Sequence, residues 1–141
     1  MKILTGLPEE TVAFGRQLGE QLPDHSIVCL YGELGAGKTT LIKGIAAGVT
    51  GLDPDAINSP TYVYLNVYGG KRTLYHFDLY RLRDVEEFLG MGFEEYWETG
   101  GVCCIEWAER IASIIPPDAI TIQLSHVGAE SRQIEVRGLK S

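Results

Sequence analysis

Three glycines, a lysine and a threonine lie close together in residues 32–39, Gly-Glu-Leu-Gly-Ala-Gly-Lys-Thr. This segment matches the Walker A pattern GxxxxGK[ST], in which the glycines let successive backbone N–H groups surround a phosphate. Lys38 is expected to reach the β- and γ-phosphates, and the Thr39 hydroxyl is expected to coordinate Mg²⁺. The segment therefore predicts a nucleotide site with contacts from Gly32, Glu33, Leu34, Gly35, Ala36, Gly37, Lys38, Thr39 and Thr40.

Two carboxylates, Glu106 and Asp78, each end a segment that is typical of a β-strand. A carboxylate in that position can hold Mg²⁺ or polarise the water that attacks the γ-phosphate. Glu106 is the first choice for the metal ligand because four apolar residues precede it, whereas His76 makes the other segment more amphipathic. Both carboxylates are candidate catalytic residues together with Lys38, and the division of roles between them stays open.

Two further residues are candidates for contacts with the nucleotide. Thr61, in Ser59-Pro60-Thr61, follows the P-loop helix at a position where many nucleotide switches place a γ-phosphate sensor. From sequence position alone, a turn that starts the next strand is the favoured interpretation. Trp107 directly follows Glu106, which would bring its indole near the nucleotide if it is not simply a core residue. No Asn-Lys-x-Asp sequence that reads guanine occurs, so adenine is the expected base and ATP the expected cofactor.

The elements around the glycine loop occur in the order that the motif requires. Residues 26–31 read as a buried strand that runs directly into the loop, and a helix is expected from about Lys38 to Gly51 because its apolar residues recur at helical spacing. An earlier helix opens at Pro8, and Pro23 ends it.

The remaining segments predict a mixed sheet. A hairpin is predicted for residues 62–68 and 73–80, and a last pair of strands for residues 119–125 and 133–137. Between them, two helical segments are predicted at 84–89 and 93–98, followed by a strand at 102–105. We therefore predict a P-loop NTPase-like α/β fold over a single domain, 1–141, with parallel strands at the centre and antiparallel strands at the edges of a sheet that is flanked by helices.

Composition excludes several classes of protein. The chain has 141 residues, 45% of them hydrophobic, and no apolar stretch approaches the ~20 residues of a membrane helix, so a cytoplasmic protein is expected. A net charge of −7 disfavours independent binding of nucleic acid, which depends on lysine and arginine. The cysteines, Cys29, Cys103 and Cys104, are expected to be buried thiols, and His76 is expected in a strand that faces solvent.

Taken together, four motifs resemble those of the TsaE family, formerly YjeE: the glycine loop, residues 59–62, His76-Phe77-Asp78-Leu79-Tyr80-Arg81, and Ile105-Glu106-Trp107. The resemblance implies a bacterial ATPase required to form threonylcarbamoyladenosine (t6A) in tRNA, and it covers nearly the whole chain. It also implies roles in phosphate, metal or switch contacts for the matched residues Lys38, Thr39, Thr61, Asp78, Glu106 and Trp107.

The resemblance further implies that ATP hydrolysis acts on a TsaB–TsaD complex and resets it between turnovers, with tRNA contacted only through these partners. Local ion pairs are expected for Arg81 and Arg83, so the sequence offers no arginine finger and isolated hydrolysis should be slow. Two alternatives remain: a small-molecule kinase, and a switch in which ATP orders a docking surface without being hydrolysed.

Overall fold

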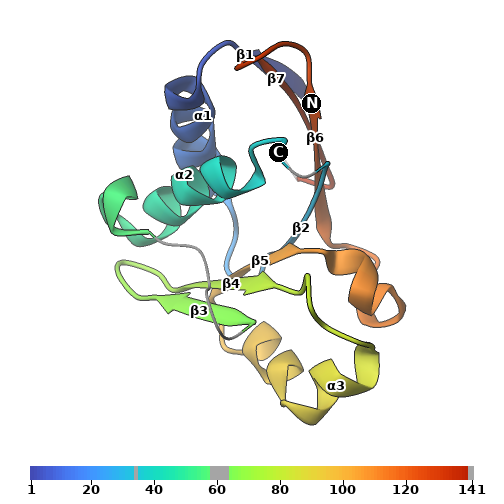
Figure 1. Ribbon diagram of the computed structural model, residues 1–141. Coiled ribbons are helices and arrows are strands. Elements are labelled where there is room, and N and C mark those ends of the chain that lie inside the picture. The colour runs from blue at the N-terminus through green and yellow to red at the C-terminus, as the bar shows by residue number, and fades with distance from the viewer. Residues whose placement is uncertain (34, 58–63, 140–141) are drawn as a thin grey trace.

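The computed structural model describes residues 1–33, 35–57 and 64–139. Within these residues seven strands form one sheet in the order β1-β7-β6-β2-β5-β4-β3 (Figure 1). The strands are β1 (Lys2–Thr5), β2 (Ile27–Tyr31), β3 (Leu65–Tyr68), β4 (Leu74–Asp78), β5 (Val102–Glu106), β6 (Ile120–His126) and β7 (Arg132–Arg137). Neighbouring strands from β6 through β2 and β5 to β4 are parallel, and the outer pairs are antiparallel. The predicted mixed sheet is therefore confirmed.

Helices cover both faces of this sheet (Figure 1). They are α1 (Pro8–Gln21), α2 (Lys38–Thr50), α3 (Val85–Gly90) and the 3₁₀ helices η1 (Pro54–Ala56), η2 (Phe93–Glu98) and η3 (Ala108–Ile114). One face packs aliphatic side chains of β2, β5 and β6 against α1 and α2. The other packs Phe77, Phe88 and Ile111 with the aromatic residues of η2. The two cores fix the sheet between α2 on one side and α3 with η3 on the other.

Helix α2, which follows the glycine loop, is held very close to α1. A Cβ atom built on Gly44 would lie 2.2 Å from the Val12 carbonyl oxygen, and one built on Gly48 would lie 2.2 Å from that of Arg16. Only glycine allows the two backbones to approach this closely. The close contact fixes α2 along its length, and with it the position of Lys38 at its first turn.

The three thiols lie in the two cores, as predicted. Cys104 belongs to the aliphatic core and its neighbour Cys103 to the aromatic core, because adjacent strand residues point to opposite faces. Burial raises the pKa of Cys29 to about 11 and that of Cys103 to about 12. These groups are consequently neutral and serve as core residues.

Several local features differ from expectation. β1 was not predicted; it is four residues long and pairs with β7 at the edge of the sheet, where a short pattern carries little signal. Residues 93–98 and 108–114 form 3₁₀ helices, of which only the first was expected to be helical. No helix in the described ranges is both long and apolar enough to cross a bilayer. A single domain over 1–141 stays a prediction.

Candidate nucleotide site

The glycine loop joins the end of β2 to the start of α2. Gly35 and Gly37 have φ angles of 81° and 97°, a left-handed conformation that favours glycine. Gly37 is the N-cap of α2, and no side chain in the described part of the chain caps the helix. The N–H groups of the first helical turn thus have no intrahelical acceptor, and the helix dipole adds partial positive charge at the same point. This end of α2 is suited to bind an anion.

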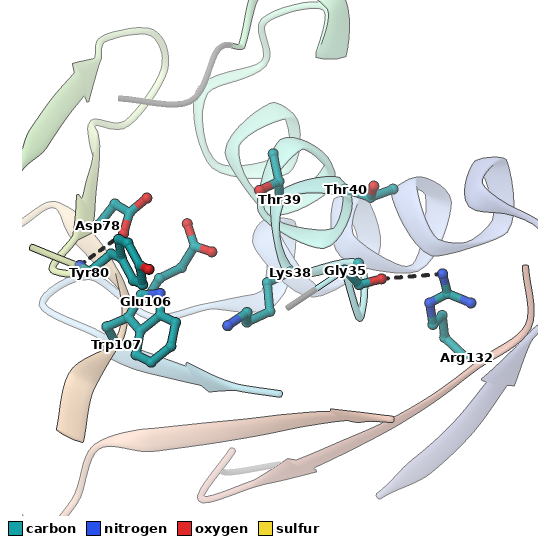
Figure 2. Close-up of a pocket in the computed structure, with 10 residues that line it drawn as sticks. Gly35, Lys38, Thr39, Thr40, Asp78, Tyr80, Glu106, Trp107 and Arg132 are labelled. Atoms are coloured by element: carbon teal, nitrogen blue, oxygen red, sulfur yellow. Dashed lines mark hydrogen bonds between the residues drawn. The ribbon is translucent and has the colours of Figure 1, made fainter. Parts of the chain in front are cut away.

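Two strand ends lie opposite this loop. β4 and β5 are parallel neighbours, and their register pairs Asp78 with Glu106. Both carboxylates therefore come to the same edge of the sheet, although 27 residues separate them in the sequence. Figure 2 shows Asp78 and Glu106 together with Tyr80 and Trp107 on one side of the site.

A cavity of about 520 Å³ lies between these two regions. We define the P-loop wall as Gly35, Gly37, Lys38, Thr39 and Thr40, and the carboxylate wall as Asp78, Tyr80, Glu106 and Trp107; Arg132 also lines the cavity. Its volume falls in the ordinary range of pockets for small molecules, roughly 300–1,000 Å³. The structure thus brings eight predicted site residues around one cavity: Gly35, Gly37, Lys38, Thr39, Thr40, Asp78, Glu106 and Trp107.

Glu106 is buried, with 6% of its surface exposed, and is held by a histidine. Its Oε2 atom lies 2.7 Å from Nε2 of His76, a residue of β4 that is only 1% exposed. The expectation that His76 faces solvent is therefore wrong. Its side chain lies on the same face of β4 as that of Asp78, two residues along, and this face is covered by α2 rather than by water.

Asp78 lies in a less protected position. It is partly buried, and its Oδ1 atom accepts a hydrogen bond of 3.2 Å from the backbone N–H of Tyr80. Burial, and then the nearby charge of Glu106, raise the pKa of Asp78 above its ordinary value of 3.8. Two carboxylates that repel each other are a common feature of sites that bind a cation or transfer a proton.

Trp107 is turned toward the P-loop by an unusual backbone. Its φ and ψ angles of 60° and 39° are left-handed, a conformation that costs about 1–3 kcal/mol for a non-glycine residue and is concentrated at functional sites. The Nζ atom of Lys38 lies 4.9 Å from the centroid of its ring, and the ring of Tyr80 lies 5.1 Å away, centroid to centroid (Figure 2). The indole therefore connects the two walls.

Other predicted contacts lie elsewhere. Gly32, Glu33 and Ala36 are not among the cavity-lining residues; Glu33 is exposed, and its carbonyl oxygen accepts a turn hydrogen bond from the N–H of Ala36. Leu34 and Thr61 lie outside the described residues, so the γ-phosphate sensor stays a prediction. The expected ion pair of Arg83 is present, with Nε 3.7 Å from a Glu87 carboxylate oxygen, whereas Arg81 makes no ion pair with any described residue.

Three residues of the site were not predicted: His76, Tyr80 and Arg132. His76 could have been found from its spacing, since residues i and i+2 of a strand share a face and Asp78 was already a candidate. Tyr80 follows Asp78 in the same motif. Arg132 has no local signal, because only the pairing of β7 with β6 brings it to the loop.

The donor set fits Mg²⁺. The Thr39 hydroxyl and the two carboxylates are hard oxygen donors around one cavity. The described residues contain no group of three or more His, Cys, Asp or Glu side chains that could hold a metal without help. Such a partial set is typical of Mg²⁺ sites, which usually combine one or two carboxylates with phosphate oxygens and water. Thr39, Glu106 and Asp78 are the residues that would hold the ion.

Similarity to known proteins identifies the family of the chain. The family model for Threonylcarbamoyl adenosine biosynthesis protein TsaE matches residues 6–134. The tRNA threonylcarbamoyladenosine biosynthesis protein TsaE of Treponema pallidum is 41% identical, covering 96% of this chain and 99% of that protein. The protein of the same name from Bacillus subtilis is 38% identical, covering 95% of this chain and 83% of that one.

A solved structure supports the same relationship. The crystal structure of YdiB from Bacillus subtilis matches with a TM-score of 0.76 and 32% sequence identity, covering 95% of this chain and 82% of that chain. The likeness therefore extends over the sheet and both helical layers. On these grounds the chain belongs to the TsaE family of threonylcarbamoyladenosine biosynthesis proteins.

Proposed function

We propose that this chain is a Mg²⁺-dependent ATPase that acts on a TsaB–TsaD complex and supports its repeated turnover in t6A formation. The observation that carries the proposal is the meeting of the P-loop wall and the carboxylate wall around one cavity. A P-loop alone supports binding of phosphate. A strand-end carboxylate facing it supports hydrolysis, because such a group can hold the metal or orient the attacking water.

In this proposal each wall has its own task. The first turn of α2 and Lys38 bind and orient the phosphates, and bound Mg²⁺ would supply neutralisation of the charge that develops on them. Glu106, oriented by His76, and Asp78, with its raised pKa, are placed to hold the ion or to accept a proton from water. The Trp107 ring packs against Lys38, whose Nζ atom lies 4.9 Å from its centroid, and so helps to fix the position of the lysine.

Slow hydrolysis by the isolated chain is part of the proposal. Arg110 lies with its Cζ atom 5.5 Å from the centroid of the Trp107 ring, but its Nη2 donates to the carbonyl oxygen of Tyr80 and the residue does not line the cavity. Arg132 is bound to backbone carbonyl groups. Neither of these two arginines is free to act as a finger, a group worth about 10³–10⁵ in rate, and Arg81 and Arg83 do not line the cavity. A partner is therefore expected to complete the site.

The test is a measurement of phosphate release by the chain alone, with the TsaB–TsaD pair, and with the pair and tRNA, alongside multi-turnover formation of t6A. We expect release to rise with the partners and t6A to continue beyond one turnover only when the chain is present. ATP binding without release under any condition would favour the docking switch. Transfer of the γ-phosphoryl group to a small acceptor would favour the kinase.

A further inference from the structure

Arg132 stands at the start of β7, 95 residues after Gly37, yet it contacts the glycine loop. Its Nε atom donates to the carbonyl oxygen of Ala36 at 3.0 Å, and its Nη2 lies 3.5 Å from that of Gly35. Figure 2 shows it on the side of the loop away from Trp107. The guanidinium thus binds carbonyl oxygens of the loop, whereas a phosphate would be bound by the N–H groups of the loop.

The same guanidinium also holds the turn between β6 and β7. Its Nη1 atom donates to the carbonyl oxygen of Ser131 at 2.9 Å and lies 3.3 Å and 3.4 Å from those of Ala129 and Gly128. A planar guanidinium can make contacts in several directions at once, whereas a lysine ammonium is a point charge on a flexible stem. Arg132 therefore joins two loops that are far apart in the sequence.

The contact with Ala36 has a consequence for the next residue. In a planar trans peptide the C=O and N–H groups point in opposite directions. A guanidinium that holds the Ala36 carbonyl oxygen therefore directs the N–H of Gly37 away from itself. Gly37 has no side chain, lines the cavity, and has the left-handed φ that brings its N–H and those of α2 into one series.

We propose that Arg132 is a positioning residue for the phosphates: it binds the carbonyl groups of Gly35 and Ala36 and so orients the N–H of Gly37 as a phosphate donor. The inference rests on the proposed nucleotide site. It assigns to the carboxy-terminal hairpin, whose sequence has no nucleotide-binding motif, a role in setting affinity for the nucleotide. Arg132 acts through the loop backbone and transfers no proton.

The test compares the wild type with Arg132→Lys, which keeps the charge, and Arg132→Gln, which removes it. Arg137→Gln is the matched control: Arg137 lies on the same strand but is exposed, and among the described residues its ion pair is with Glu135 alone, at 3.2 Å. The probe is the fluorescent nucleotide N-methylanthraniloyl-ADP, titrated in the presence of Mg²⁺. Thermal unfolding of each variant without nucleotide shows whether it is folded.

We expect both Arg132 variants to raise Kd by about tenfold or more, the equivalent of one hydrogen bond to a charged group, while Arg137→Gln stays within about twofold. A purely structural role would lower Tm and leave Kd unchanged. If Arg132→Gln does not fold, the Kd of Arg132→Lys alone tests the inference.

Two results would overturn the inference. Wild-type Kd in both Arg132 variants would show that the loop does not need the contact. Wild-type Kd in Arg132→Lys with weak binding in Arg132→Gln would show that charge, and not the orientation of the backbone, is what matters. If the wild-type chain bound no nucleotide, the proposed function would fail together with the inference about Arg132. Failure of the proposed function is therefore distinguishable from failure of the inference alone.

Discussion

The P-loop wall is one continuous stretch of chain, whereas the carboxylate wall is assembled from the ends of two strands and the residues that follow them. The first wall offers backbone N–H groups and one lysine, and the second offers two carboxylates and two aromatic rings. Binding of phosphate is therefore expected to depend mainly on the first wall, and hydrolysis mainly on the second. Substitutions in each wall should separate the two properties.

The largest effect is expected from Glu106→Gln in the carboxylate wall. The amide keeps the size of the side chain and can still bond to His76, but it is a poor metal ligand and no base. We expect kcat for partner-stimulated hydrolysis to fall by about 10²–10⁴, with Kd for the nucleotide nearly unchanged. Single-turnover hydrolysis and a fluorescent nucleotide titration measure the two quantities. Hydrolysis at the wild-type rate would remove Glu106 from the reaction and leave Asp78 as the candidate.

Lys38→Ala, in the P-loop wall, should affect both properties. Lys38 is proposed to contact the phosphates in the ground state and the transition state, so loss of its charge should weaken binding and lower the hydrolysis rate by about 10²–10³. Lys43→Ala, in the same helix α2 but outside the cavity, is the matched control and should bind nucleotide normally. If Lys38→Ala changed only kcat, the division of tasks between the walls would be wrong.

His76 should have a smaller effect, exerted through Glu106. His76→Leu fills the buried space but cannot donate to the carboxylate, whereas His76→Gln can. We expect the leucine variant to need about 10–100-fold more Mg²⁺ for half-maximal activity, and the glutamine variant to recover part of that loss. Binding of Mn²⁺ with a non-hydrolysable nucleotide, followed by electron paramagnetic resonance, provides a readout apart from activity. Equal metal affinity in the two variants would show that His76 does not act through a hydrogen bond to Glu106 and serves only as a core residue.

The smallest effect is expected from Asp78→Asn on stability, measured without nucleotide or divalent ions. Folding raises the pKa of Asp78 above 3.8, so between 3.8 and the folded value the native chain binds this proton more tightly than the unfolded chain. Stability therefore falls as the pH rises through that interval, and the cost persists at neutral pH. Removing the charge should raise Tm by at most about 3 °C at pH 7, because solvent screens a partly exposed group.

The gain in Tm should disappear near pH 3, where Asp78 is protonated in both states. Thermal unfolding followed by circular dichroism at the two pH values checks this. Asp118→Asn is the control, because Asp118 is exposed and its side chain makes no hydrogen bond or ion pair with any described residue. A lower Tm for Asp78→Asn at pH 7 would indicate that the hydrogen bond from Tyr80 outweighs the repulsion.

Much of the site could be predicted because its signals are local. The glycine loop, the helix that starts at Lys38 and the strand that ends at Glu106 each depend on the order and type of adjacent residues. His76 was placed wrongly because its strand looked amphipathic when considered alone, and whether that face meets water or α2 is a matter of packing. The strand β1 was missed because four edge residues carry too short a pattern.

By itself the sequence determined where the glycine loop lies, the class of the fold and the family, because these depend on spacing along the chain. Only the tertiary structure decided which carboxylates meet, what holds them, and which distant residue supports the loop. The register of β4 and β5 pairs Asp78 with Glu106, and the pairing of β6 with β7 brings Arg132 to the loop. The residues in these contacts are far apart in the sequence, and no local pattern links one to the other. Strand order and packing bring them together.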